Sequence, residues 1–238
     1  MKKLFVLVAT LLVVVTTQAQ KKIKGNGKMT TITRTTSDYD GVKCAGSFDY
    51  ILVSGTEGKI TIEGEENLLE YIVTEVKDGN LIVKTEDRIN LRTSYNKTIK
   101  ITIPFQDINS VSLAGSGDLW NEDKITSTNL KVALAGSGDL KLTVDASSID
   151  ASLAGSGDLT LKGNTNSLEA SVAGSGDFHG FDLQTNHTIV SVAGSGDATV
   201  VSNESLKARV SGSGDIKYKG NPKTEDTKVA GSGKIESN

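Results

Sequence analysis

The residues best placed to do chemistry are six aspartates that recur along the second half of the chain. They are Asp118, Asp139, Asp158, Asp177, Asp197 and Asp215, at intervals of 18 to 21 residues. Each ends a copy of the phrase Gly-Ser-Gly-Asp, and a seventh copy carries Lys234 at the aspartate position. If the chain stacks in turns of this length, the carboxylates form a column with neighbours ~4.8 Å apart. Two charges at that spacing repel by about 0.9 kcal/mol even in bulk water, so the column needs compensation.

Two kinds of compensation fit the aspartate column. The interpretation we favour is that each carboxylate accepts hydrogen bonds from the serine hydroxyl or backbone N–H groups of its Gly-Ser-Gly corner. The alternative is that cations, above all Ca²⁺, lie between turns, as in β-helices built from Gly-Gly-x-Gly-x-Asp nonapeptides. Here the spacing is twice as long, and Ala replaces the first Gly. We therefore expect no cofactor, with the aspartate column as the candidate metal site if one exists.

The other reactive side chains do not form a catalytic set. His179 and His187 occupy different positions in the repeat, with no third ligand at metal-binding spacing, so we expect both to be exposed polar residues. Cys44 aligns with leucines such as Leu113 and is predicted to be a small buried apolar residue. A catalytic nucleophile is single, whereas the Gly-Ser-Gly-Asp phrase recurs. We predict no catalytic residue and no enzyme.

The spacing of the phrase predicts a solenoid. Apolar and polar residues alternate before each phrase, as in Leu130, Val132 and Leu134, and alternation resumes after it, as in Leu140 and Leu142. Each repeat therefore reads as a strand, a glycine corner, a second strand and a polar stretch. Because one such unit cannot enclose a core, successive units must stack in parallel and in register. The expected fold is an all-β parallel β-helix with turns of about 19–20 residues.

The first half of the mature chain carries a blurred form of the same pattern. Strands are predicted over residues 29–34, 48–53, 59–63, 71–76, 80–85 and 98–103. Asp78-Gly79 is typical of a hairpin turn, and Glu65–Glu70 fits one helical turn. We divide the chain into an irregular N-terminal β region, 29–107, and a regular repeat stack, 108–238, which together form one continuous domain.

The N-terminal 28 residues indicate export. Residues 1–19 have two lysines, an apolar run and small residues before Gln20, which together predict a signal peptide. Residues 20–28 are basic and Gly-rich, and they predict a flexible lead-in. No later apolar run reaches ~20 residues, so we expect no transmembrane segment after cleavage.

The net charge of −3 and only four arginines argue against nucleic acid as a partner. One cysteine excludes an internal disulfide.

The chain also resembles the bacterial family called "putative auto-transporter adhesin, head domain", once a domain of unknown function. The resemblance rests on Tyr39-Asp-Gly-Val42, Gly46-Ser-Phe-Asp49, Ile60–Glu63 and Glu75-Val-Lys-Asp-Gly79, together with the repeated corners. It implies an all-β stack and a periplasmic or surface location, and it transfers no catalytic residue. With the predicted signal peptide, we expect an exported protein in the periplasm, at the cell surface or secreted.

The function we predict is therefore a non-enzymatic, exported adhesin or envelope scaffold with an unidentified carbohydrate or protein ligand. Two alternatives remain open: a polysaccharide lyase or hydrolase on the same scaffold, and a Ca²⁺-dependent binding module.

Overall fold

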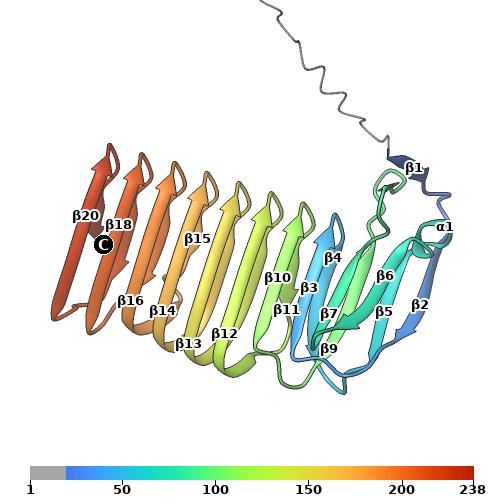
Figure 1. The fold of residues 1–238 in the computed structure, drawn as a ribbon, viewed down its shortest axis with the longest axis horizontal. Helices are drawn as coiled ribbons and strands as arrows, with labels where there is room; N and C mark the ends of the chain where they lie inside the picture. The colour runs from blue at the N-terminus through green and yellow to red at the C-terminus, as the bar shows by residue number, and fades with distance from the viewer. Residues whose placement is uncertain (1–19) are drawn as a thin grey trace, which may run out of the picture.

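The fold is a rod of stacked β-strands. The computed structural model describes residues 20–238; the predicted signal peptide, 1–19, lies outside them. Parallel strands build a β-solenoid of about seven turns behind a less regular N-terminal region, as Figure 1 shows. The predicted fold class is confirmed, and the repeated glycine bends lie directly above one another, with Gly115, Gly136 and Gly155 paired in register.

The first face of the solenoid consists of the strand segments that lead into the glycine corners. They belong to β3 (Gly41–Gly46), β10 (Ser110–Gly115), β12 (Ile125–Gly136), β13 (Leu140–Gly155), β14 (Leu159–Gly174), β16 (Leu183–Gly194), β18 (Ser205–Gly212) and β20 (Thr224–Gly231). All seven neighbouring pairs in this series are parallel. Inward-facing Leu, Val, Ile and Ala side chains of successive turns therefore stack into a continuous core.

The second face follows the corners. It is formed by β4 (Asp49–Ser54), β11 (Leu119–Asn121), the first residues of β13 and β14, β15 (Phe178–His179), β17 (Ala198–Val201), β19 (Ile216–Lys219) and β21 (Ile235–Ser237). These segments also pair in parallel. A third face is shorter, because only the starts of β12 and β16 and the middle of β13 and β14 contribute to it.

The N-terminal region extends the first two faces with a mixture of parallel and antiparallel pairs. Its further elements are β2 (Met29–Thr35), β5 (Lys59–Glu65), α1 (Glu66–Leu69), β6 (Ile72–Lys77), β7 (Asn80–Thr85) and β9 (Lys100–Phe105). β7 continues the first face from β3 and turns back as the β6–β7 hairpin; β9 continues the second face from β4 and is followed by β5 and β2. The hairpin turn at Asp78-Gly79 is confirmed by positive φ at both residues, and the predicted helical turn is α1.

Two glycines at each corner are required for different reasons. The first, such as Gly155, has a φ of 133°, which side-chain-bearing residues rarely adopt. The second, such as Gly157, lies so close to the turn below that a Cβ atom would sit 1.9 Å from the carbonyl oxygen of Gly138. The first glycine therefore supplies backbone angles that other residues avoid, and the second allows successive turns to stack closely.

The lead-in differs from its prediction. Lys21–Lys24 form β1, which pairs in parallel with β8 (Ile89–Arg92) as a separate two-stranded sheet. The sequence of this segment does not predict the pairing, because the partner strand lies almost 70 residues away. Only Ile23 and Leu91 of the two strands pack against the core. Across residues 20–238 no helix has the length and apolar character needed to cross a bilayer.

Candidate functional site

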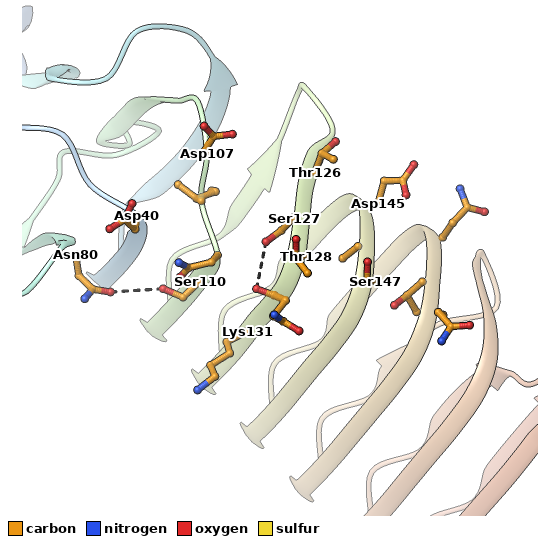
Figure 2. A pocket seen from close by; sticks show the side chains of 17 residues that line it. Asp40, Asn80, Asp107, Ser110, Thr126, Ser127, Thr128, Lys131, Asp145 and Ser147 are labelled. Atoms are coloured by element: carbon orange, nitrogen blue, oxygen red, sulfur yellow. Dashed lines mark hydrogen bonds between the residues drawn. The ribbon is translucent and has the colours of Figure 1, made fainter.

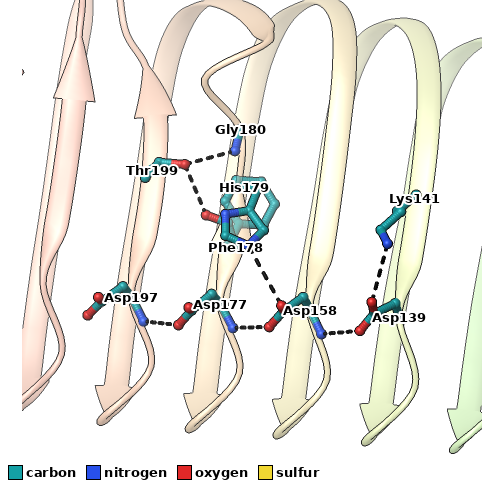
Figure 3. Close-up of polar contacts among 9 residues, drawn as sticks. All are labelled: Asp139, Lys141, Asp158, Asp177, Phe178, His179, Gly180, Asp197 and Thr199. Atoms are coloured by element: carbon teal, nitrogen blue, oxygen red, sulfur yellow. Dashed lines mark hydrogen bonds and ion pairs between the residues drawn. The ribbon is translucent and has the colours of Figure 1, made fainter.

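The six aspartates form the predicted column, and a chain of hydrogen bonds links them; Figure 3 shows the part from Asp139 to Asp197. In each turn the backbone N–H of the aspartate donates to Oδ1 of the aspartate one turn earlier. The N···O distances are 2.9 Å from Asp139 to Asp118, 3.2 Å from Asp158 to Asp139, 3.0 Å from Asp177 to Asp158, 2.8 Å from Asp197 to Asp177 and 2.7 Å from Asp215 to Asp197. The N–H of Lys234 closes the series on Asp215 at 2.8 Å. One oxygen of every carboxylate is thus occupied by the backbone.

These hydrogen bonds support the interpretation that backbone N–H groups compensate the negative charge of the column. The donor, however, is not the one that the sequence predicted. The N–H belongs to the aspartate of the following turn, not to the serine or glycines of the same corner. The corner N–H groups instead donate to glycine carbonyls: Ser156 and Gly157 both donate to the Gly136 oxygen, at 2.8 and 3.1 Å. The corner serines, such as Ser156, are exposed. Because Oδ2 is not used in this ladder, the cation alternative remains a prediction.

Basic side chains neutralise the column unevenly. The position two residues after each aspartate faces outward next to the carboxylates. It holds Trp120, Lys141, Thr160, His179, Thr199 and Lys217 in successive turns. Lys141 forms an ion pair with Asp139 Oδ2 at 3.3 Å. Among residues 20–238, no other aspartate of the column, including Asp158 and Asp177 in its middle section, forms an ion pair with a lysine or arginine.

The structure brings His179 to this middle section. Its Nε2 lies 3.8 Å from Asp158 Oδ2, and one ligand atom from each of Asp158, Asp177 and His179 lies within 4.8 Å of the other two. Both histidines are exposed, as predicted. The sequence offers no third ligand for His179 at metal-binding spacing, because the two carboxylates that lie near it come from different turns. His187 instead contacts Ser205 Oγ at 2.9 Å and Glu204 at 3.4 Å.

Cys44 is buried and unreactive in this setting. Its side chain packs in the first face between Leu113 and Val83, and it is 2% exposed, which confirms the prediction. Burial raises the pKa of the thiol well above its usual value, so the thiolate needed for nucleophilic chemistry is disfavoured.

A larger hollow lies where the N-terminal region meets the regular stack. It is an open groove of ≈ 1150 Å³ (Figure 2). Side chains from four stretches line it: Asp107 to Ser110, Thr126 to Asn129, Asp145 to Ser147 and Asn164 to Asn166. Asp40, Asn80 and Lys131 complete the lining. No aromatic side chain of the described residues is part of it.

The groove exists because the third face begins only with β12. Residues 106–109 run on the other side of the groove and approach β12 through one backbone bond, from the Lys131 N–H to the Asn109 carbonyl at 2.8 Å. β10 pairs with β12 from Lys131 onward, and β13 covers the opposite edge of β12 from Ile125. Within the described chain, the edge of β12 over residues 125–129 therefore has no strand partner on the groove side.

The groove is polar and slightly acidic. Its charged side chains are Asp40, Asp107, Asp145 and Lys131, and Asp145 is already paired with Lys124 at 3.1 Å. Hydroxyl and amide groups make up most of the remaining lining, and some of them bond one another; the Ser110 hydroxyl donates to Asn80 Oδ1 at 3.5 Å. Such a surface suits a ligand that supplies many hydrogen bonds and little apolar area.

The sequence interpretation passed over these groove residues. They fall in the polar stretches between repeats, for which the sequence predicted no binding role. The available signal was that the polar stretches 126–129, 145–147 and 164–166 occupy one corner of successive turns, whereas residues 106–109 break the strand pattern beside them.

Comparison with known proteins places the fold. The family described as "putative auto-transporter adhesin, head GIN domain" matches residues 38–222. The chain belongs to this family. A "putative adhesin" of Bacteroides fragilis is 25% identical, with a TM-score of 0.81, over 91% of this chain and 100% of its own. A "putative lipid binding protein" of Parabacteroides distasonis is 27% identical, with a TM-score of 0.76, over 92% and 100%. No curated protein matches.

The match to the adhesin head-domain family includes both candidate surfaces but not the last turn of the rod. The aspartate column from Asp118 to Asp215 and the whole groove lie within the matched residues. The last turn, with β20, β21 and Lys234, lies beyond them.

Proposed function

We propose that this chain is a non-enzymatic, adhesin-like binding module that is exported and acts in the bacterial cell envelope or at its surface. The family description and the similarity to the Bacteroides fragilis protein support the adhesin-like role. The repetition of the acidic residues also supports it, because a catalytic site needs one singular cluster with assigned acid and base roles.

The observation that carries the binding mode is the unpaired edge of β12 inside the polar groove. An extended peptide can add to such an edge through main-chain hydrogen bonds, while neighbouring side chains select its sequence. The Ser, Thr and Asn side chains around Thr126 and Ser147 offer further donors and acceptors. The ligand class we propose is therefore an extended, polar, neutral or basic peptide segment of a partner protein.

Two other ligand classes fit the groove less well. Sugar rings commonly stack on aromatic side chains, and the lining has none within the described residues. An acyl chain needs a concave apolar surface, whereas Asp, Asn, Ser and Thr dominate this groove. Lipid binding by the Parabacteroides distasonis relative is therefore not carried over to this site.

The test is ligand selection with a blocked groove. The chain is screened against a phage-displayed library of linear peptides and, in parallel, against a glycan array. Thr126→Arg places a long side chain in the groove, and Thr143→Arg places the same side chain on an exposed threonine of β13 that does not line it. We expect peptide enrichment that falls at least about tenfold in Thr126→Arg and persists in Thr143→Arg.

Absence of peptide enrichment, or enrichment insensitive to Thr126→Arg, would contradict the proposed binding mode. Glycan binding that is lost only in Thr126→Arg would replace the peptide with a carbohydrate. Turnover of a uronate-containing polysaccharide by the purified chain would contradict the non-enzymatic role.

A further inference from the structure

We propose that Asp158, Asp177 and His179 form a binding site for a divalent transition metal ion of the Zn²⁺ class. The site lies on the second face, outside the groove, and does not depend on the proposed peptide binding. It replaces a uniform Ca²⁺ column with one localised site in the middle of the rod.

The first argument is the number and type of free ligand atoms that converge. One carboxylate oxygen of each aspartate and one imidazole nitrogen of His179 lie within 4.8 Å of one another (Figure 3). Zn²⁺ bonds carboxylate oxygen and imidazole nitrogen at about 2.0–2.2 Å. Ligand atoms around one ion are then at most roughly 4.4 Å apart, so small side-chain rotations bring the three into bonding range.

The second argument is that the aspartates are already held in place. Asp158 Oδ1 accepts the N–H of Asp177 at 3.0 Å, and Asp177 Oδ1 accepts the N–H of Asp197 at 2.8 Å. These bonds fix the orientation of both carboxylates and leave the second oxygen of each free. A rigid pair of outward oxygens loses little conformational entropy when it binds an ion.

The third argument is local charge. Lys141 neutralises Asp139 on one side, and Lys217 occupies the equivalent outward position in the turn that carries Asp215. Between them the outward positions hold Thr160, His179 and Thr199, so His179 is the single basic group there. Neither Asp158 nor Asp177 has a lysine or arginine ion-pair partner within the described chain, so a bound cation would relieve the repulsion between their carboxylates.

The turn that carries His179 also differs from its neighbours. β15 ends at His179, because the next residue, Gly180, leaves the strand and its N–H bonds to the Thr199 carbonyl at 2.8 Å. Beside the histidine lies a hollow of ≈ 130 Å³, lined by Asp177, His179, Asp197, Thr199 and Lys217 among others. Asp158 is not among its lining residues, so the hollow lies on the Asp197 side of the proposed ion, where water can supply coordination that the three protein ligands leave open.

The donor set selects the metal. Ca²⁺ prefers six to eight oxygen ligands, whereas imidazole suits Zn²⁺, Co²⁺, Ni²⁺ and Cu²⁺. One nitrogen with two carboxylates therefore favours a transition metal over Ca²⁺.

The experiment titrates the chain, produced without a histidine tag, with Zn²⁺ by calorimetry and with Co²⁺ by visible absorption. Two variants remove a ligand: His179→Ala and Asp158→Asn, the latter keeping an Oδ1 that can accept the Asp177 N–H. Two controls are matched to them: His187→Ala removes the only other histidine, and Asp139→Asn alters the column beside Lys141. Circular dichroism checks that each variant is folded.

We expect one equivalent of Zn²⁺ to bind, with affinity reduced at least about tenfold in both ligand variants and unchanged in both controls. Absence of Zn²⁺ and Co²⁺ binding would overturn the proposal, as would equal losses in His179→Ala and His187→Ala. Ca²⁺ binding that ignores His179→Ala but weakens equally in Asp139→Asn and Asp158→Asn would restore the uniform column in its place.

Discussion

At the scale of single residues, the glycine corner is the most constrained part of the molecule. Gly136 O accepts two N–H groups from the turn above it, and the Cα of Gly155 passes so close that an added Cβ would lie 2.1 Å from that oxygen. The positive φ of Gly155 adds a conformational penalty for any side chain. Space and backbone angle therefore exclude other residues independently.

We predict that Gly155→Val destabilises the stack by more than about 1 kcal/mol, since a β-branched residue meets both constraints. The measurement is the midpoint of denaturant unfolding followed by circular dichroism. Ser156→Val is the control, because the neighbouring Ser156 is exposed and surface substitutions stay within about 0.5 kcal/mol. Equal midpoints for Gly155→Val and the parent chain would refute the close stacking at the corner.

Residue spacing also explains which site residues the sequence could reveal. The aspartates share one repeat position, so their column followed directly from the period. His179 shares no position with the aspartates, and its approach to Asp158 requires the exact stacking of two turns and the orientation of three side chains. The repeat length predicts which residues stack at the same position of successive turns. Contacts between residues at different repeat positions depend on side-chain geometry, which the repeat length does not specify.

At the scale of secondary-structure elements, Glu65 links the first strand to the rest of the N-terminal region. Its side chain is fully buried and accepts hydrogen bonds from the backbone N–H of Gly27, the backbone N–H of Ser94 at 2.8 Å and the Ser94 hydroxyl at 2.6 Å. Burial raises the pKa of this carboxyl, but the hydrogen bonds from Ser94 and Gly27 and the charge of Lys97 outweigh burial and hold it below its usual value. The ionised form thus anchors the segment that follows β1.

We predict that Glu65→Gln loosens β1 and residues 92–97, because a neutral amide accepts these bonds more weakly and brings an unmatched NH₂ group into a buried site. Hydrogen exchange should become faster in both segments, with Glu63→Gln on the exposed side of β5 as the control. Unchanged exchange in Glu65→Gln would contradict the anchoring role.

The same carboxylate makes the anchor sensitive to acid. A carboxyl whose pKa is lowered by folding contributes stability that is complete above the unfolded-state pKa, about 4.3, and is lost as the pH falls through the lower folded-state pKa. Exchange of β1 in the parent chain, expressed relative to the intrinsic amide exchange rate at each pH, should therefore increase below about pH 4. The increase should be much smaller in Glu65→Gln, and equal increases in both proteins would assign the acid sensitivity to other groups.

Elements with local signals were predictable, and those with distant partners were not. The alternating strands of the regular stack, the Asp78-Gly79 hairpin and α1 follow from short patterns. β1 pairs with β8, and β2 pairs antiparallel with β5, through contacts that depend on how the N-terminal region folds back over the stack. The groove arises in the same way, because residues 106–109 pass β12 without pairing along 125–129.

At the scale of the whole molecule, the two ends of the rod differ in whether other elements cover them. The N-terminal end is covered by the antiparallel strands β2 and β6 and by α1 (Figure 1). The C-terminal end has no covering element among the described residues, so β20 presents a strand edge to solvent. A stack of identical turns would continue to add strands at such an edge.

Polar residues at core positions of β20 oppose this growth. Where β18 places Leu206 and Ala208 inward, β20 places Glu225 and Thr227 at the paired positions. The Glu225 carboxylate accepts a hydrogen bond from the Tyr218 hydroxyl at 3.1 Å, which satisfies it within one chain. An inward-pointing charge at an edge strand penalises the docking of a second strand, because docking would bury that charge.

We predict that Glu225→Leu makes the C-terminal end adhesive and produces self-association that increases with protein concentration, measured by analytical ultracentrifugation. Lys228→Leu is the matched control, because it places the same side chain on β20 in register with the outward Arg209 and not over the core. The parent chain and Lys228→Leu should share one sedimentation behaviour, whereas Glu225→Leu should form larger species. If Lys228→Leu associates as strongly as Glu225→Leu, the association results from added surface hydrophobicity and not from loss of the inward charge, which would contradict the role of Glu225.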